Sequence, residues 1–341
     1  MNVKLLGSIG VVRYSTELYK NLKNLNNTFQ HLDQKMCTTM PFLGAGLAFP
    51  LQTSLESFNG YDIVHNLPCY PFLAKLNKDT MLVTTAHEFQ AVLYSKLNAI
   101  QEMGIKDKAW TELVAKPGIK SALNSDLILA NSIQTQKEAI SLGVSRKKVI
   151  LTSLGVDERF LRNTRQQQHN RKCFKIGFIG TLSPRKNVPF LIRSFKKIAS
   201  NSIFLEMWGK SIYPQSYIEN LIGTNKRIAW RGFAPETNFV RIYDSFDAFA
   251  YLSLYEGFGL PILEAKARGL PVIILKHSKI SPEVRRDCFE IDTPEELSDI
   301  ILTLKSNGYN ETAQRKAMKN AQRFTWKKTA ETTLSAYKTL C

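Results

Sequence analysis

Cysteine is scarce in this chain. The 341 residues include five cysteines, an odd number, and no two of them have Cys-x-x-Cys spacing. Zinc sites and disulfide frameworks need cysteines at short or regular spacings, so the sequence indicates neither. Disulfides are rare in proteins of reducing compartments, whose cysteines need no pairing, and we therefore expect a cytoplasmic protein. The five positions are Cys37, Cys69, Cys173, Cys288 and Cys341.

Long apolar runs are also missing. The longest, residues 40–51, is far shorter than the run of about 20 residues that crosses a bilayer. We predict a buried strand or loop there. The alternative is an apolar loop that touches a lipid-linked acceptor or the bilayer surface. A strand pattern begins at residue 2 and runs into a glycine turn, so we expect no secretory signal.

Acidic residues are few relative to basic ones. The 46 Lys and Arg residues outnumber the 29 Asp and Glu residues, which gives a net charge of +17. A charge of this size favours a partner or surface of opposite sign. The basic residues are spread over both halves and do not cluster with aromatic residues, so we expect no nucleic-acid partner. Attraction to an anionic acceptor or to the headgroups of an anionic membrane is our hypothesis.

Short apolar runs alternate with helical patterns along the whole chain. This order predicts an α/β fold with parallel sheets whose faces are covered by helices. The length suits two domains rather than one. Residues 163–172 have no apolar side chains and are predicted to be a linker. We predict one domain over residues 1–162, joined by a C-terminal helix at about 327–341, and a second domain over residues 173–326.

One stretch of the chain places a glycine loop between a strand and a helix. Residues 248–254 are an apolar run of strand length, and Pro261 suits the first turn of the helix that follows the loop. A glycine loop at a helix N-terminus exposes N–H groups that bind anions. Glu256 and Glu264 would repel an anion, so we expect both to face neutral hydroxyl groups. A nucleotide sugar, which carries a diphosphate between two sets of sugar hydroxyls, fits this layout.

The same stretch, Glu-Gly-Phe-Gly-Leu-Pro followed by a second Glu, resembles the signature of retaining glycosyltransferases. The resemblance is to enzymes of the GT-B fold, in which two Rossmann-like, doubly wound domains face each other across a cleft. Among these enzymes, the stretch is most similar to glycosyltransferase family 4, the glycosyl transferases of group 1. The resemblance implies that Glu256 approaches the donor sugar and that Glu264 binds the ribose. It also implies that loop amides hold the diphosphate, which assigns this role to Gly257, Phe258, Gly259 and Leu260.

A histidine follows another buried strand pattern. The apolar and β-branched run at 81–86 ends in His87 and Glu88. A histidine at such a position can bind a phosphate oxygen or a sugar hydroxyl, and its pKa range suits proton transfer. Family 4 commonly has His-Asp here, whereas this chain has Glu88 in place of the aspartate. The resemblance implies that His87 is an active-site imidazole.

Two basic residues lie between the strand pattern at 175–180 and a helical pattern that begins near Val188. Cations at this position would stabilise a departing diphosphate, whose negative charge grows as it leaves the sugar. Family 4 uses an Arg and a Lys in this loop, and Lys186 matches the lysine. Thr181 stands where the arginine is usual, so we expect Arg185 to take that role.

Two further glycines are candidate donor-binding positions by resemblance. Gly10 lies in the turn after the first strand, although this turn is shorter than is usual in the family. Gly209 follows a later strand, where the family counterpart brings a backbone glycine close to the nucleotide. Glycine permits such close approach because it has no side chain.

These features predict a metal-independent hexosyltransferase that needs no cofactor and acts with retention. Its substrates would be a nucleotide-diphosphate sugar and a hydroxyl acceptor such as a lipid-linked or growing oligosaccharide. The sequence of residues 180–187 is similar to that of mannosyltransferase-like members of the family and favours GDP-mannose as the donor. We expect a cytoplasmic protein, with peripheral attachment to the cytoplasmic face of the membrane as a hypothesis. Two alternatives are a sugar-nucleotide epimerase or phosphorylase on this fold, and a non-enzymatic basic protein that binds lipid or nucleic acid.

Overall fold

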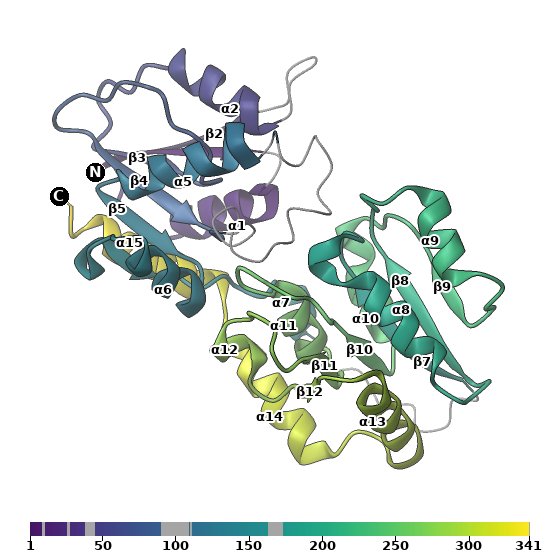
Figure 1. The fold of residues 1–341 in the computed structure, drawn as a ribbon. Helices are drawn as coiled ribbons and strands as arrows, with labels where there is room; N and C mark the ends of the chain where they lie inside the picture. The colour runs from purple at the N-terminus through teal and green to yellow at the C-terminus, as the bar shows by residue number, and fades with distance from the viewer. Residues whose placement is uncertain are drawn as a thin grey trace. The chain divides into compact units, whose positions relative to one another are not determined.

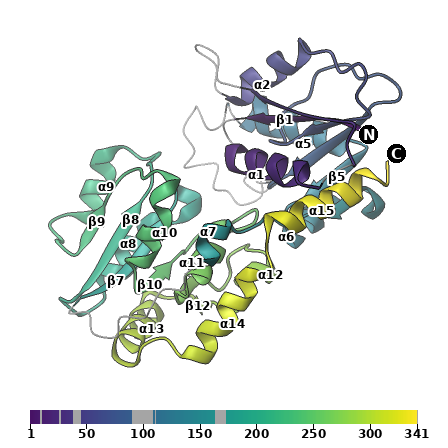
Figure 2. The ribbon, with the colours of Figure 1, turned by 180° about the vertical axis from the view of Figure 1, so that it is seen from behind.

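The chain folds into two compact units (Figures 1 and 2). The computed structural model describes residues 1–8, 11–25, 28–37, 45–89, 109, 111–162 and 173–340. The first unit comprises residues 1–155 and 326–341, and the second comprises residues 156–325. The division falls at Gly155 rather than at residue 162. The predicted linker lies outside the described residues.

The first unit is built on a six-stranded parallel sheet in the order β2-β1-β3-β4-β5-β6. The central strands are buried, which explains why they read as continuous apolar runs rather than alternating ones. The strands are β1 (Asn2–Ser8), β2 (His31–Cys37), β3 (Ile63–Asn66), β4 (Met81–Ala86), β5 (Leu127–Ala130) and β6 (Val149–Leu151).

Helices cover this sheet and come from both ends of the chain (Figure 2). The C-terminal helix α15 packs beside α1 within the first unit. Within the described residues, the helices of this unit are α1 (Val12–Lys23), α2 (Ala45–Ser54), the π-helix η3 (Thr111–Ala115), α5 (Lys116–Leu123), α6 (Ile133–Ser141), the 3-10 turn η4 (Arg146–Lys148) and α15 (Trp326–Tyr337).

The apolar run at 40–51 is not the strand or loop that we predicted. Its described part, from residue 45, belongs to helix α2, and Pro50 lies inside that helix. Phe49 is fully buried in a cluster with Leu6 and Val64 of the sheet. The run was ambiguous because an apolar stretch of this length fits a buried helix as well as a buried strand.

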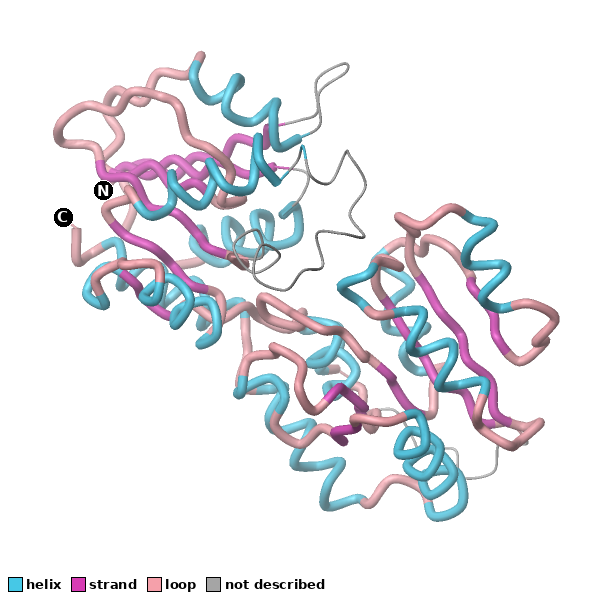
Figure 3. The backbone as a smooth tube through the Cα atoms, viewed as in Figure 1, coloured by secondary structure: helices cyan, strands magenta, loops and turns pink. Residues whose placement is uncertain are grey.

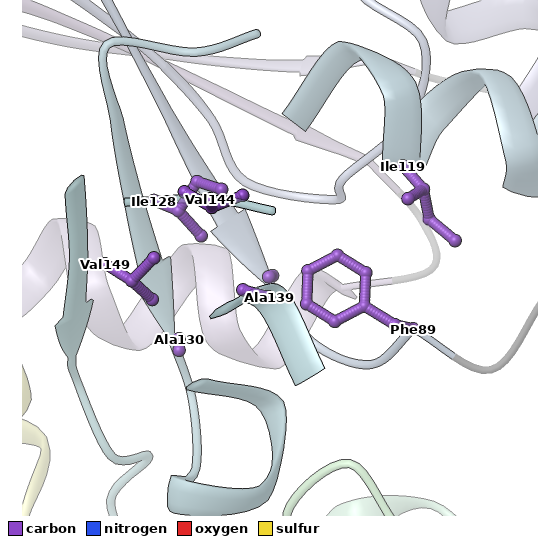
Figure 4. Close-up of a cluster of buried hydrophobic side chains, with 8 residues drawn as sticks. Phe89, Ile119, Ile128, Ala130, Ala139, Val144 and Val149 are labelled. Atoms are coloured by element: carbon purple, nitrogen blue, oxygen red, sulfur yellow. The ribbon is translucent and has the colours of Figure 1, made fainter. Parts of the chain in front are cut away.

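One core cluster of the first unit lies where helices α5 and α6 pack on the neighbouring strands (Figure 4). Phe89 is the largest buried side chain of this cluster and lies three residues beyond the end of β4. The cluster comprises Ala86, Phe89, Ile119, Ile128, Ala130, Ala139, Val144 and Val149.

The second unit contains another six-stranded parallel sheet, whose strands are magenta in Figure 3. The strand order is β12-β11-β10-β7-β8-β9. Its strands are β7 (Phe174–Ile179), β8 (Ile203–Trp208), β9 (Ile228–Trp230), β10 (Ala248–Ala250), β11 (Val272–Leu275) and β12 (Phe289–Ile291). Its helices and 3-10 turns are α7 (Glu158–Leu161), η5 (Pro184–Lys186), α8 (Val188–Lys196), α9 (Gln215–Ile222), η6 (Glu236–Asn238), α10 (Phe239–Asp244), α11 (Leu260–Ala267), α12 (Pro282–Arg285), α13 (Pro294–Asn307) and α14 (Glu311–Gln322).

Strands β7 and β10 are neighbours at the centre of the second sheet. From β7 the chain continues to β8 on one side, and from β10 it continues to β11 on the other. This is a topological switch point, where the loops after two central strands diverge and leave room for a ligand. Both sheets are parallel and flanked by helices, so the predicted α/β fold class is confirmed. Among the described helices, none is both long and apolar enough to span a membrane.

A chain of buried hydrogen bonds joins α15 to the first sheet. Tyr337 Oη lies 2.6 Å from His65 Nδ1, and His65 Nε2 lies 2.7 Å from Thr85 Oγ1. Tyr14 of α1 reaches the same Thr85 hydroxyl at 2.9 Å. His65 is fully buried, and burial lowers its pKa to about 3, helped by repulsion from His87. His65 is therefore a neutral structural residue at pH 7.

We predict that the protein loses stability in mild acid through His65. An unfolded histidine takes up a proton near pH 6.5, whereas folded His65 does so only near pH 3. The unfolded chain therefore binds more protons between these values, and the free energy of unfolding attributable to His65 falls by about 2 kcal/mol from pH 7 to pH 5. Denaturant unfolding at both pH values measures this. His65→Gln should lose about half of the total fall, because buried His87, whose pKa is lowered to about 4, contributes a similar share; the exposed His277→Gln should keep the wild-type dependence. A His65→Gln protein with the wild-type pH dependence would contradict the assignment.

Candidate functional site

The candidate site of the second unit is formed by the loops after β7 and β10. The amide of Leu254 donates to the carbonyl oxygen of Arg185 at 2.9 Å. The hydroxyl of Ser253 lies 3.1 Å from the same oxygen. These contacts tie the two loops together at the switch point of the sheet, so residues about 70 positions apart in sequence become neighbours.

The loop after β7 turns its lysine inward. The 3-10 turn η5 ends at Lys186 and is followed by Asn187, whose left-handed conformation (φ 53°) allows α8 to begin at the next residue. Asparagine tolerates this conformation better than most residues. Lys186 is only 7% exposed as a result, and Arg185 is partly buried beside it. A lysine this buried needs an anionic or polar partner.

Glu256 supplies that partner for both cations. Lys186 Nζ lies 2.6 Å from Glu256 Oε1, and Arg185 Nη1 lies 3.1 Å from Glu256 Oε2. Lys186 also donates to the hydroxyl of Tyr251, and Ser253 donates to Glu256 Oε1. We call these five residues the charge cluster. Arg185 Nη1 also donates to the carbonyl oxygen of Tyr255 at 3.0 Å.

Burial and charge act in opposite directions on Glu256. Burial raises the pKa of this carboxyl group, but the ammonium of Lys186 and the guanidinium of Arg185 outweigh it and lower the pKa overall. Burial raises the pKa of Tyr251 well above its usual value, and the charge of Glu256 adds to the effect. Glu256 is therefore ionised at neutral pH, while Tyr251 keeps its proton.

The charge cluster shows partners of Glu256 that we did not expect. We expected this carboxylate to face neutral hydroxyl groups, because it would repel a bound anion. In the structure both of its oxygens contact cations. The expectation considered only the glycine loop and ignored the loop after β7, which the fold brings to the same place.

Helix α11 begins directly after the glycine loop. Gly259 caps the helix in a left-handed conformation (φ 103°), and a Cβ there would lie 3.3 Å from side-chain atoms of Ile262 and Val284. That combination of conformation and crowding favours glycine. The loop residues Gly257, Phe258 and Gly259 are buried, and Leu260 is half-buried. The ring of Phe258 packs against Phe324, so this residue has only main-chain groups to offer a ligand at the helix N-terminus.

The second glutamate lies one turn inside α11. Glu264 is 2% exposed, and Tyr243 of α10 donates to its Oε2 at 2.9 Å. The hydroxyl of Tyr243 also lies 3.3 Å from the carbonyl oxygen of Pro261 in the first turn of the helix. Tyr243 therefore fixes the orientation of the Glu264 carboxylate relative to the start of α11.

Gly209 has a structural reason to be glycine. It lies just beyond β8. A Cβ there would lie 2.0 Å from the carbonyl oxygen of Gly180, which directly follows the neighbouring strand β7. The amide of Gly209 donates to the carbonyl oxygen of Gly232 at 2.7 Å, which extends the sheet by one residue. Gly180, Gly209 and Gly232 lie close together where three loops begin. This close packing requires a glycine at position 209, whether or not a ligand also approaches.

His87 belongs to the first unit and follows β4. Its Nε2 lies 2.8 Å from the carbonyl oxygen of Leu67, which can only accept, so Nε2 carries the proton and Nδ1 is an acceptor. The ring of Tyr14 meets the imidazole edge-on at 4.9 Å between centroids. Burial lowers the pKa of His87 to about 4, so it is neutral at pH 7. Gly10, the other candidate from this unit, lies outside the described residues.

The sequence did not single out Tyr251, Ser253 or Tyr243. The first two lie in the run that we predicted as a strand, but β10 ends at Ala250, so both lie in the loop. Their position at the carboxyl end of a central strand was the available signal. Nothing in the sequence links Tyr243 to Glu264. In the described part of the chain, no three His, Cys, Asp or Glu side chains are grouped so that they could hold a metal ion.

Comparison with known proteins identifies the family. The family model "Glycosyl transferases group 1" matches residues 160–340, about half of the chain, including the whole charge cluster. The chain belongs to the glycosyl transferases group 1 family. The match covers the second unit from residue 160 onward and also helix α15 of the first unit.

Curated relatives are distant. The chain is 29% identical over 173 residues to O-antigen chain mannosyltransferase B of Escherichia coli, covering 48% of this chain and 45% of that protein. It is 23% identical over 308 residues to D-inositol 3-phosphate glycosyltransferase of Kribbella flavida, covering 82% of this chain and 71% of the relative. The match thus spans less than half the length of the first of these relatives.

Solved structures match over the whole chain. Sucrose-phosphate synthase of Thermosynechococcus elongatus superposes with a TM-score of 0.75 at 16% identity, covering 100% of this chain and 99% of that one. HepE of Anabaena, crystallised with UDP and glucose, superposes with a TM-score of 0.69 at 19% identity, covering 99% and 100%. At such low identity the likeness shows the fold alone, and it confirms the prediction of two Rossmann-like units of the GT-B type.

The packing at Gly209 generates a prediction about stability. Gly209→Ala should lower the free energy of unfolding by about 2 kcal/mol or more, because the new Cβ meets the Gly180 carbonyl. Gly232→Ala is the matched control: this glycine also has a positive φ (71°), but nothing lies within 4 Å of a Cβ there. It should cost about 1 kcal/mol, from backbone strain alone. Denaturant unfolding measures both, and equal losses would contradict the packing account.

Proposed function

We propose that this protein is a glycosyltransferase that moves a hexosyl unit from a nucleotide-diphosphate sugar to a hydroxyl acceptor, with retention of configuration. The observation that supports this most strongly is the pair of cations, buried Lys186 and partly buried Arg185, beside the glycine loop that precedes α11. The helix N-terminus and the cations together favour a diphosphate. Glu264 then lies within the helix at a position suited to ribose hydroxyls.

The proposed chemistry depends on charge that develops on the leaving group. When the bond between the sugar and the phosphate breaks, the electron pair stays with the diphosphate and its negative charge grows. Lys186 and Arg185 bind that charge more strongly in the transition state than in the ground state, which lowers the barrier. We propose that these cations and the loop amides suffice for this step, without a metal ion.

We propose that His87 binds a sugar hydroxyl through its Nδ1. The Leu67 carbonyl holds the proton on Nε2, so Nδ1 can accept a hydrogen bond. Because the pKa of His87 is lowered to about 4, the ring stays neutral through the physiological range and does not compete with the cations for the diphosphate.

For the substrates we propose transfer of mannose from GDP-mannose to a lipid-linked or growing oligosaccharide. Two relatives support a mannosyl donor by name: O-antigen chain mannosyltransferase B and mannosylfructose-phosphate synthase of Agrobacterium fabrum, the second 26% identical over 172 residues. The net charge of +17 supports peripheral contact with an anionic membrane, which we place on the cytoplasmic face.

A donor screen tests this proposal. The melting temperature of the protein would be measured with GDP-mannose, UDP-glucose and ADP-glucose, since a ligand that binds the folded state raises it. We expect GDP-mannose to give the largest shift. A larger shift with a UDP sugar would contradict the choice of donor, and no shift with any nucleotide sugar would contradict the proposed function itself.

Two substitutions separate the proposed roles of Lys186 and Glu264. Lys186→Ala should lower kcat by about 100-fold with a smaller change in KM, because its charge acts mainly on the transition state. Glu264→Ala should raise the Kd for the nucleotide by roughly tenfold, because it removes hydrogen bonds to the ribose. Lys197→Ala is the control, since that exposed lysine pairs with Glu295. Steady-state kinetics and calorimetry measure the effects, and wild-type values in the first two variants would refute the assignments.

A further inference from the structure

The Glu256 carboxylate occupies the two cations that a donor diphosphate would need. Lys186 Nζ lies 2.6 Å from one carboxylate oxygen, and Arg185 Nη1 lies 3.1 Å from the other. Carboxylates and phosphates bind lysine and arginine through the same charge-assisted hydrogen bonds. A diphosphate that binds these cations therefore competes with Glu256 for them.

The competing groups lie at the same place in the fold. Glu256 directly precedes the glycine loop, and a Cβ added at Gly259, the N-cap of α11, would lie 3.9 Å from the Cβ of Glu256. The Glu256 side chain thus starts beside the helix N-terminus at which the proposed function places the diphosphate, and its carboxylate contacts the two cations. Lys186 has little freedom to serve both anions at once, because it is buried and its ammonium lies 4.7 Å from the centre of the Tyr251 ring.

We propose that Glu256 is a placeholder for the donor diphosphate. Without donor, its carboxylate neutralises part of the charge of Lys186 and Arg185 and keeps both side chains in position. When a diphosphate binds, it takes over the cations, and Glu256 becomes free to accept hydrogen bonds from the hydroxyls of the sugar. This inference rests on the proposed function and adds an exchange of anions to it.

The exchange avoids leaving a buried charge without a partner. Breaking a buried ion pair by removing one partner is strongly destabilising, because the remaining charge stays desolvated. Replacement of one anion by another keeps Lys186 and Arg185 paired throughout. The released Glu256 keeps the hydroxyl of Ser253 as a partner, and Lys186 keeps the hydroxyl of Tyr251.

The exchange also couples donor binding to product release. The placeholder lowers the affinity for any diphosphate, because binding must displace the carboxylate from both cations. After transfer the sugar hydroxyls no longer hold Glu256. The carboxylate can then bind the cations again, which favours departure of the nucleoside diphosphate.

Glu256→Gln tests the proposal by the sign of its effect on binding. The amide keeps the shape of the side chain and removes the competing charge. Calorimetry with inorganic pyrophosphate, GDP and UDP should show tighter binding than in the wild type, by roughly five- to tenfold, and a steeper loss of affinity with added salt. Transfer activity should fall in the same variant. Unchanged or weaker binding of all three probes would overturn the proposal.

Glu290→Gln is the matched control for net charge. Glu290 lies in the same unit and pairs with Arg285 at 2.8 Å, outside the charge cluster. This variant changes the charge of the protein by the same amount, and its pyrophosphate affinity should equal that of the wild type. If it tightens binding as much as Glu256→Gln, a general charge effect explains the result and the proposal is wrong.

A thermal measurement covers the case in which Glu256→Gln is too unstable for calorimetry. The variant should melt below the wild type, because Lys186 and Arg185 lose their shared anion. Pyrophosphate should raise its melting temperature by more than it raises that of the wild type, because the added anion replaces the missing carboxylate. A variant that pyrophosphate does not restore would contradict the placeholder role.

If the wild type binds none of the three probes, the proposed function fails; if only the comparison between variants fails, this inference alone is wrong.

Discussion

The site of the second unit depends on one interaction, the buried ion pair between Glu256 and Lys186, reinforced by Arg185. A lysine that is 7% exposed would be costly without this partner. The carboxylate would be equally costly without the cations, which outweigh the effect of burial on its pKa. Each charge therefore offsets the free-energy cost of burying the other. Their pairing also holds the two loops that carry them in one arrangement.

The topology of the sheet creates this interaction. Because β7 and β10 are adjacent and their connections leave in opposite directions, the loops that follow them meet at the carboxyl edge. The amide of Leu254 and the hydroxyl of Ser253 both donate to the carbonyl oxygen of Arg185 and hold the two loops together. The same edge holds the N-terminus of α11, so cations, amides and acids gather where a phosphorylated ligand could bind.

The sequence predicted the fold class, and it named Lys186, Arg185 and Glu256, which the structure brings together; both results depend on local patterns. Buried parallel strands read as apolar runs, and the glycine loop with its proline marks the start of α11. The partners of Glu256 could not be predicted from local pattern, since Lys186 is 70 positions away and only the sheet order brings them together. The same limit applies to Tyr243 and Glu264. The helix at Ala45–Ser54 was missed because its apolar run has no periodicity that separates helix from strand.

A double-mutant cycle on Lys186 and Glu256 tests the central claim most directly. The free energy of unfolding would be measured for Lys186→Met, Glu256→Gln and the double variant. If the ion pair supports the site as described, each single variant leaves a buried charge and loses stability. The double variant then loses less than the sum, with a coupling of about 1–3 kcal/mol. Additive losses, with no coupling between the two positions, would contradict the account.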